Sequence, residues 1–165
     1  MRAAIYPGTF DPITYGHLDI IERASRLFDK ITITVASNPN KKTLFSAKER
    51  VFLIKQSITD IDNGSNLEVE TFKGLIVNFA KEKKAAAIIR GLRAISDFEY
   101  ELQMALMNRR LEGEITTVFL MPHENYTYLN STIVKEVAHL GGNISNFVPP
   151  IVEKKLKEKN LRKQP

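Results

Sequence analysis

Short apolar runs alternate with longer segments of helical periodicity along the whole of this 165-residue chain. Five runs of β-branched or aliphatic residues predict strands at 3–6, 31–36, 67–72, 86–89 and 116–121. Helical patterns lie at 17–29, from 46 onward, at 74–83, 96–111 and 132–140, and after Pro149 and Pro150. This alternation predicts an α/β fold: a doubly wound, Rossmann-like, five-stranded parallel sheet with helices on both faces.

The length predicts one domain, which we assign to residues 1–150, with 151–165 as a basic C-terminal helix or tail of the same domain. The net charge of +5 suggests an anionic partner. Residues 153–165 contribute +4 of it, however, and the rest of the chain only +1. This placement favours small phosphorylated ligands over nucleic acid. A nucleic-acid-binding module is the alternative, and it predicts steeply salt-dependent binding to DNA or RNA.

Several classes of protein are excluded by what the sequence lacks. The chain has no cysteine, and therefore no disulfide, thiolate nucleophile or thiolate metal site. No apolar run approaches the ~20 residues that span a bilayer, and Pro7 and Gly8 interrupt the start before a signal-peptide core could form. We therefore expect a cytoplasmic protein with no membrane partner.

Groups suited to phosphate binding are concentrated in the loops that follow the predicted strands. In a doubly wound sheet these loops meet at the carboxyl ends of the strands, where ligands bind. The first loop offers Gly8, Thr9 and, at a helix start, Gly16 and His17. Later loops offer Lys41 and Lys42, then Arg90, Gly91, Leu92 and Arg93, and finally the hydroxyl-rich segment 126–132. Such a cluster predicts a site for phosphorylated ligands.

Other nucleotide-binding and metal-binding signatures are absent. The sequence contains neither G-x-x-x-x-G-K-[ST] nor G-x-G-x-x-G, which argues against a P-loop NTPase and a dinucleotide dehydrogenase. Carboxylates with metal-ligand spacing are also lacking, so no protein metal site is predicted. A magnesium ion would be held mainly through substrate phosphates. Asp11 is expected to order the first loop rather than to act as a base.

Two helix starts carry a capping-box pattern, Ser46 with Glu49 and Ser96 with Glu99. The second of these helices has two apolar stripes, one of Phe98, Leu102 and Ala105 and one of Tyr100, Met104, Met107 and Leu111. One stripe should face the sheet. The other could pack on a second subunit or inside a larger core, and the sequence favours neither.

The segment Thr14-Tyr15-Gly16-His17 is similar to the T/H-x-G-H signature of the nucleotidyltransferase superfamily. The longer block 6–19, with the blocks at 89–94, 97–101, 118–122 and 134–137, closely resembles the bacterial phosphopantetheine adenylyltransferase family over about residues 2–150. The resemblance implies reversible transfer of the adenylyl group of ATP to 4′-phosphopantetheine, giving dephospho-coenzyme A and pyrophosphate, with magnesium. It also implies direct in-line attack on the α-phosphate, and a homohexamer.

Site residues follow from the resemblance position by position. His17, Lys41 and Arg90 match catalytic positions, and Thr9, Lys41, Ile76 and Arg90 match positions that bind phosphopantetheine. ATP-binding positions match Thr9, Phe10, His17, Gly91, Leu92, Arg93, Glu101, Tyr126, Thr127, Tyr128, Leu129, Asn130, Ser131 and Thr132. The family often has a run of serines where this chain has Asn130, Ser131 and Thr132, so the donor at Asn130 differs. A related nucleotidyltransferase with another phosphorylated acceptor is the alternative function.

Overall fold

Five strands and six α-helices make up the computed structural model, which describes residues 2–37, 42–61, 66–93 and 95–161. The strands are β1 (Ala3–Gly8), β2 (Lys30–Ala36), β3 (Leu67–Phe72), β4 (Ala87–Gly91) and β5 (Thr116–Leu120). The helices are α1 (Tyr15–Ser25), α2 (Ala47–Ser57), α3 (Ile76–Glu82), α4 (Ile95–Leu111), α5 (Ser131–His139) and α6 (Pro150–Leu161), with a 3-10 turn η2 (Glu124–Tyr126).

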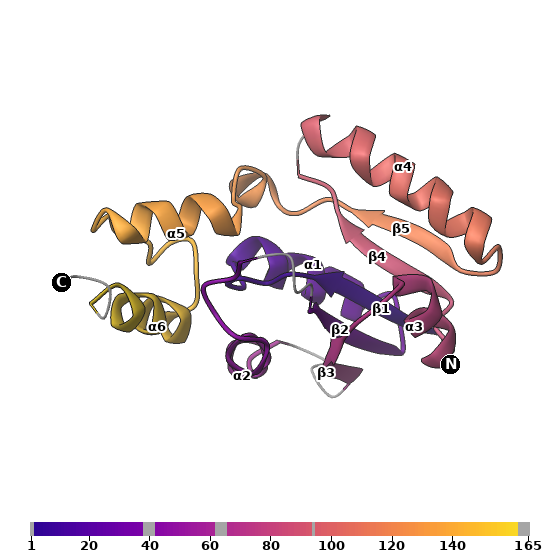
Figure 1. Cartoon of the computed structure of the whole chain (residues 1–165), viewed down its shortest axis with the longest axis horizontal. Coiled ribbons are helices and arrows are strands. Elements are labelled where there is room, and N and C mark those ends of the chain that lie inside the picture. The colour runs from indigo at the N-terminus through magenta and orange to yellow at the C-terminus, as the bar shows by residue number, and fades with distance from the viewer. Residues whose placement is uncertain (1, 38–41, 62–65, 94, 162–165) are drawn as a thin grey trace.

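The strands form one parallel sheet in the order β3-β2-β1-β4-β5 (Figure 1). From β1 the chain builds outward first through β2 and β3, and then on the other side through β4 and β5. The direction of winding therefore reverses between β1 and β4, and α5 and α6 lie beyond the carboxyl ends of the strands (Figure 1). The predicted five-stranded doubly wound sheet is confirmed, and a ligand site is expected at this reversal.

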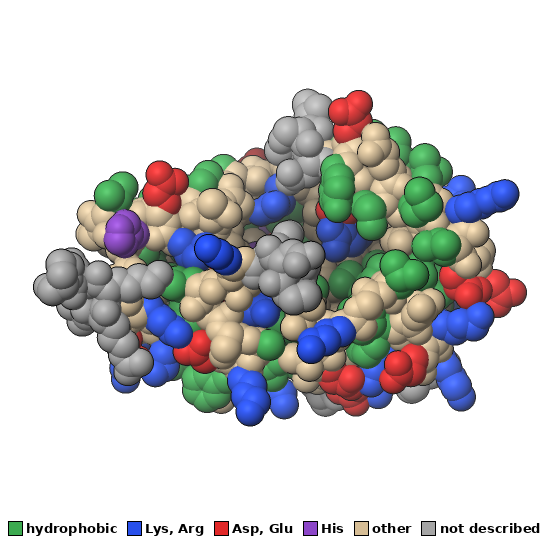
Figure 2. All heavy atoms as spheres, in the orientation of Figure 1, with side chains coloured by type: hydrophobic (Ala, Val, Ile, Leu, Met, Phe, Trp, Pro, Cys, Tyr) green, Lys and Arg blue, Asp and Glu red, His purple; other side chains and the backbone are tan. Residues whose placement is uncertain are grey.

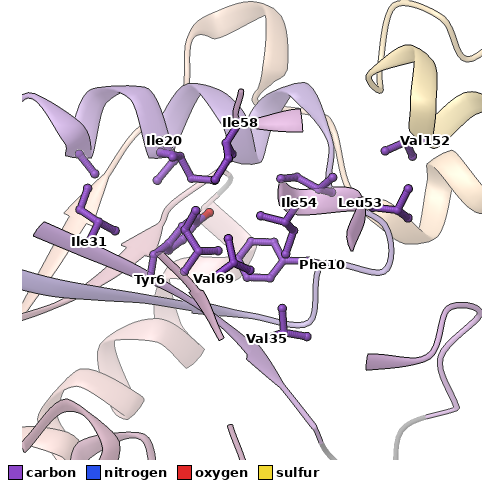
Figure 3. Close-up of a cluster of buried hydrophobic side chains, with 14 of the residues drawn as sticks. Tyr6, Phe10, Ile20, Ile31, Val35, Leu53, Ile54, Ile58, Val69 and Val152 are labelled. Carbon is purple, nitrogen blue, oxygen red and sulfur yellow. The ribbon is translucent and has the colours of Figure 1, made fainter. Parts of the chain in front are cut away.

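Buried side chains cover both faces of the sheet. On one face, Tyr6, Ile33 and Val69 of the strands pack with residues of α1, α2, α5 and α6, such as Ile20 and Ile54 (Figure 3). On the other face, a smaller cluster joins strand residues to α3, and consists of Ile5, Val77, Phe79, Ala80, Ala85, Ile88 and Ile115. Alternate residues of β1 thus point to opposite faces, as the pleat of a strand requires. None of the helices in the described ranges is long and apolar enough to cross a membrane.

Two helices begin at other residues than the sequence predicts. The capping box of Ser46 and Glu49 is confirmed, with the Ser46 N–H donating to Glu49 Oε2 at 2.8 Å. The second capping box is wrong, because α4 already begins at Ile95 and Ser96 therefore lies inside the helix. Helix α1 begins at Tyr15 rather than at residue 17, because Thr14 is its N-cap.

The expectation that one apolar stripe of α4 faces the sheet is also wrong. Among the described side chains of this helix, the buried ones are Glu101 and Asn108, which are polar. The large apolar side chains are 38–63% exposed, and comprise Phe98, Tyr100, Leu102, Met104, Leu106, Met107 and Leu111. Helix α4 therefore presents an apolar outer surface that this single chain does not cover (Figure 2).

The basic C-terminal helix contributes to the main core. Val152 and Leu156 of α6 are fully buried and belong to the same cluster as the residues of α1 and α2. Three lysines of this helix form ion pairs: Lys155 with Glu158, Lys157 with Glu153 and Lys159 with Glu49. Its charge therefore lies on a solvated face, and its apolar face helps to hold α2 in place.

Candidate functional site

A cleft of about 630 Å³ opens at the carboxyl ends of β1 and β4, where the winding of the sheet reverses. Figure 2 shows basic side chains around the middle of this face, between α5 and α4. The cleft is lined by the end of β1 with the loop after it and the first turns of α1, by the segment before α2, by the end of β4 with the start of α4, by Pro122 after β5, and by the start of α5. These segments are the ones in which the sequence concentrates phosphate-compatible groups.

The loop after β1 is closely packed around Phe10. This residue is buried and has a positive φ of 48°, a conformation that its surroundings must hold for a residue other than glycine. Its ring lies edge-on to His17, with centroids 5.1 Å apart. A Cβ at Gly8 would lie 2.7 Å from the Phe10 ring, so only glycine fits beside it. Phe10 therefore packs against the imidazole of His17 and helps to hold it in place.

His17 lies in the first turn of α1 and is fixed by Thr14. The Thr14 backbone N–H donates to His17 Nδ1 at 3.1 Å, and the Thr14 hydroxyl lies 2.9 Å from the same atom. A backbone N–H can only donate, so Nδ1 must accept and the ring proton must be on Nε2. Burial, with a smaller contribution from the charge of Arg93, lowers the pKa of His17 to about 3. The cleft therefore contains a neutral imidazole with a fixed N–H donor.

We expect the depressed pKa of His17 to make the protein less stable in mild acid. Unfolded histidine binds a proton below about pH 6.5, whereas His17 in the fold does so only near pH 3. Its contribution to the free energy of unfolding is thus complete above about pH 6.5 and is lost as the pH falls. Relative to His17→Gln, the wild type should lose stability between about pH 7 and about pH 5 in urea titrations. His139→Gln, a change of an exposed histidine, is the control, and a pH-independent difference between the wild type and His17→Gln would contradict the assignment.

Arg90, at the end of β4, is held by three hydrogen bonds. Its Nε and Nη2 donate to the two carboxylate oxygens of Glu101 at 2.7 and 2.5 Å, and its Nη1 donates to the Pro7 carbonyl at 3.1 Å. Burial alone would lower the pKa of Arg90, but the hydrogen bonds and charge of Glu101 raise it. Glu101 therefore orients the guanidinium toward the cleft as a permanent cation.

The start of α5 closes the cleft on the opposite side from α4. Asn130 is the N-cap of this helix, with its Oδ1 accepting from the Ile133 N–H at 2.8 Å. The Ser131 hydroxyl donates to the Pro12 carbonyl at 2.7 Å, and Arg93 Nη1 donates to the Leu129 carbonyl at 3.0 Å. The side-chain oxygen of Asn130 thus caps the helix, and the N-terminus of α5 joins that of α1 at the cleft.

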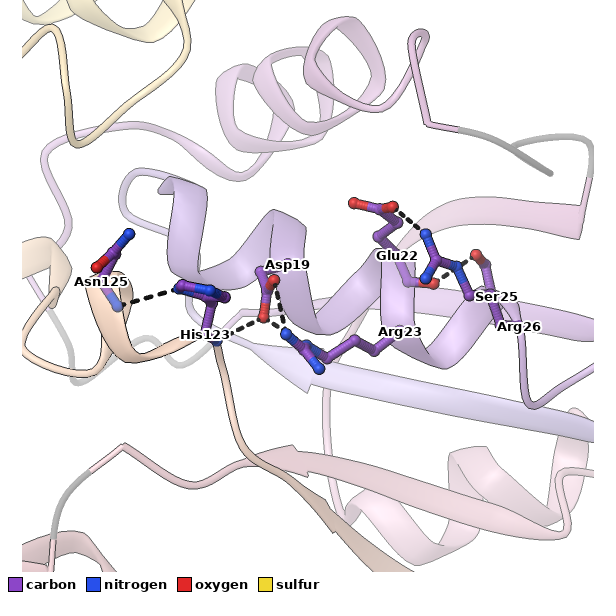
Figure 4. A network of polar contacts seen from close by, with 7 residues as sticks. All are labelled: Asp19, Glu22, Arg23, Ser25, Arg26, His123 and Asn125. Atoms are coloured by element: carbon purple, nitrogen blue, oxygen red, sulfur yellow. Dashed lines mark hydrogen bonds and ion pairs between the residues drawn. The ribbon is translucent and has the colours of Figure 1, made fainter.

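A polar network secures the segment that leads from β5 to α5. Asp19 of α1 accepts from the His123 backbone N–H at 2.8 Å and from Arg23 Nε at 2.8 Å (Figure 4). The Asn125 N–H donates to His123 Nδ1 at 3.3 Å, which makes His123 a cap of η2. His123 therefore has a structural role outside the cleft lining, as its lack of a motif suggests.

Most of the predicted site residues that the structure describes line this one cleft. They are Thr9, Phe10, His17, Arg90, Gly91, Arg93, Glu101, Leu129, Asn130, Ser131 and Thr132. Five others, Ile76, Leu92, Tyr126, Thr127 and Tyr128, do not line it in the described part of the chain, and their roles stay predictions. Lys41 lies outside the described residues, whereas its neighbour Lys42 lines the cleft.

Several residues that line the cleft are not predicted from the sequence to have a role in the site. Tyr6, Thr43, Tyr100 and Lys135 are among them. Lys135 could have been found from its spacing, because it follows Ser131 by four positions on the same helix and thus shares its face. The sequence predicts Tyr6 as the last residue of a buried strand; burial raises its pKa, so it is a neutral phenol.

The cleft offers little to hold a metal ion directly. Across the described ranges, no group of three or more His, Cys, Asp or Glu side chains has the arrangement of a metal site. Both carboxylates of the described lining are engaged, Asp11 with Lys135 and Glu101 with Arg90. This donor set fits a divalent cation that arrives on the phosphates of a nucleotide.

Comparisons with known proteins agree with this geometry. The cytidylyltransferase-like family model matches residues 5–137. Phosphopantetheine adenylyltransferase of Thermodesulfovibrio yellowstonii is 56% identical over 159 residues, which cover 96% of this chain and 97% of that protein. The enzyme of that name from Alkaliphilus metalliredigens is 54% identical over 97% of this chain and its own full length. Nicotinic acid mononucleotide adenylyltransferase of Plasmodium falciparum has the same fold, with a TM-score of 0.72, 15% identity, and coverage of 97% of this chain and 96% of that one.

Proposed function

The chain belongs to the phosphopantetheine adenylyltransferase family, within the cytidylyltransferase-like enzymes, and we propose that its cleft joins ATP to 4′-phosphopantetheine by direct in-line transfer. It is an adenylyltransferase of coenzyme A biosynthesis. The observation that most supports the proposed mechanism is the neutral, fixed N–H donor of His17, which lies in one cleft with Arg90 and Arg93.

The proposed step forms one bond and breaks one. A phosphate oxygen of 4′-phosphopantetheine attacks the α-phosphorus of ATP, and the bond from that phosphorus to the oxygen bridging to the β-phosphate breaks. Pyrophosphate leaves with the bonding electrons, and dephospho-coenzyme A is the other product. The attacking phosphate is already ionised near neutral pH, so no strong general base is needed. Catalysis then consists of positioning and charge stabilisation, and the step is reversible.

Each cleft residue has a role suited to its geometry. The Nε2–H of His17 donates to an oxygen of the α-phosphate, where negative charge increases in the transition state. Thr9, in the loop that leads to α1, lines the same cleft, and the N-terminus of α5 faces the leaving pyrophosphate. The Arg90 guanidinium, with Lys41 as its expected partner, holds the acceptor phosphate. Phe10, Gly91, Leu92, Arg93, Glu101 and the segment 126–132 form the nucleotide side of the cleft.

We propose that ATP enters as its magnesium complex. The paired state of Asp11 and Glu101 supports this assignment, because neither carboxylate is left to act as a metal ligand in the described lining. When bound, the ion would neutralise charge on the phosphates and favour departure of pyrophosphate. Lys135 and the α5 N-terminus would then face the same phosphates from the protein side.

Release of pyrophosphate from ATP tests this function directly. Release should require 4′-phosphopantetheine, and unphosphorylated pantetheine should not replace it, because the nucleophile is the phosphate. Nicotinamide mononucleotide and glycerol phosphate are the control acceptors. Release that is equally fast with either control acceptor would indicate the related transferase instead, and no release with any acceptor would contradict the adenylyl-transfer mechanism.

We propose further that the protein is a homo-oligomer, a hexamer by family resemblance, and that the apolar face of α4 forms a contact between subunits. Six large apolar side chains of this helix are exposed and lie outside the cleft lining, and they support the proposal: Phe98, Leu102, Met104, Leu106, Met107 and Leu111. Light scattering should therefore detect an oligomer of the wild type. Met107→Glu places a charge within the contact and should shift the protein toward the monomer, whereas Gln56→Glu on α2 should not. A wild-type monomer at micromolar concentration would contradict the proposal.

A further inference from the structure

A buried arginine of α2 lies beneath the cleft without lining it. Arg50 is 3% exposed, and its Nη1 donates to the Thr9 carbonyl at 2.6 Å and to the Ala36 carbonyl at 3.1 Å. Thr9 belongs to the loop after β1, and Ala36 is the last residue of β2. One guanidinium thus joins the carboxyl ends of two neighbouring strands at the level of the site.

Asp11 makes a second connection between the same two parts of the chain. Its Oδ1 accepts from the Phe45 N–H at 2.9 Å, and its Oδ2 accepts from the Leu44 N–H at 2.9 Å and from Lys135 Nζ at 2.7 Å. Arg50 therefore anchors the chain before the segment 37–43, and Asp11 anchors it afterward. This segment ends in Lys42 and Thr43, which line the same cleft as Thr9.

A contribution to stability does not explain why an arginine is buried at position 50. Its Nε is buried and has no hydrogen-bond partner among the described residues. A buried charge with an unsatisfied donor is costly, and an apolar side chain of similar size often replaces such a group without loss of stability. An apolar side chain, however, could not hold two carbonyl groups in a fixed relative position.

We propose that Arg50, assisted by Asp11, is a positioning residue for adenylyl transfer. Together they fix Thr9 relative to the segment before α2, whose Lys42 and Thr43 line the cleft next to the expected acceptor residue Lys41, so that the two reacting phosphates meet in line. The inference rests on the proposed function. Because Arg50 holds the two sides relative to each other, each side alone should still bind its own ligand when Arg50 is changed.

Arg50→Lys tests this role while keeping the positive charge. The lysine side chain is shorter than that of arginine, so its ammonium should not reach the position from which Arg50 Nη1 donates to both carbonyls. We expect kcat to fall about 10- to 100-fold, because misplacement by about 1 Å has effects of this size. Calorimetric Kd values for ATP alone and for 4′-phosphopantetheine alone should change less than about threefold, with about one site per chain. Lys55→Met removes an exposed charge from the same helix and should behave as wild type.

A merely structural role predicts a different result for Arg50→Lys, namely a lower Tm and fewer binding sites with normal turnover per site. That result, or an equal loss in kcat and in each affinity, would overturn the inference. If Arg50→Lys does not fold, Asp11→Asn decides in its place, with the same expected separation of kcat from the two Kd values. A wild type that releases no pyrophosphate would instead overturn the proposed function itself.

Discussion

Replacing His17 by alanine should lower kcat by about 10²- to 10³-fold, the usual loss when one donor to a developing oxyanion is removed. The Kd for ATP should change much less, because the Nε2–H is expected to donate most strongly in the transition state. The fold should remain intact, since His17 lies at a helix start and Thr14 can still cap α1 through its backbone. Single-turnover and steady-state measurements of pyrophosphate release check this expectation.

Two further variants sharpen the test of His17. His17→Gln keeps an uncharged N–H donor and should recover part of the lost turnover, which a mechanism using a charged imidazolium would not predict. His139→Ala removes an exposed histidine from the end of α5 and should leave turnover unchanged. Near-normal turnover of His17→Ala would contradict the role that we assign to the imidazole.

Changing Arg90 to lysine should raise KM for 4′-phosphopantetheine by about 10- to 100-fold, with a smaller effect on KM for ATP. Lysine keeps the charge but cannot reproduce the two-pronged contact with Glu101. Its ammonium would no longer be held at the position from which the guanidinium meets a phosphate. Arg90→Ala would be harder to interpret, because it would also leave the carboxylate of Glu101, whose side chain is 11% exposed, without its partner.

Arg26→Lys is the matched control for Arg90→Lys. Arg26 forms an exposed ion pair with Glu22 of α1, and neither residue lines the cleft, so the change should leave both KM values as they are. Isothermal titration of the Arg90→Lys variant with the acceptor alone separates binding from turnover. Unchanged affinity for the phosphorylated acceptor would require its site to be placed elsewhere in the cleft.

Much of the fold could be predicted because its determinants are local. The runs that form β1 to β5 are short, apolar and separated by helical periodicity, and β3 has the predicted limits. The loops after these strands could be grouped into one site because parallel strands bring their carboxyl ends together. The start of α1 was missed because His17 accepts from the N-cap N–H, a position where glutamate or glutamine is the usual signal.

The contacts that organise the site could not be predicted, because they join residues far apart in the sequence. Arg90 and Glu101 could each be interpreted as a ligand contact, yet the structure pairs them with each other. Arg50 lies 41 positions from Thr9, and Lys135 lies 124 positions from Asp11. No local pattern indicates such pairings, since they depend on how α2 and α5 pack against the sheet.

The hydrogen bond from the Thr14 backbone to His17 has a consequence for the enzyme's cycle. A side chain that donates a proton in the forward reaction must be protonated again before the next turnover. It must also begin the reverse reaction in its deprotonated form. In the proposed mechanism His17, held neutral with its proton on Nε2, would give up no proton to either substrate or product. We therefore expect the same form of the enzyme to serve synthesis and pyrophosphorolysis, with no reprotonation step between them.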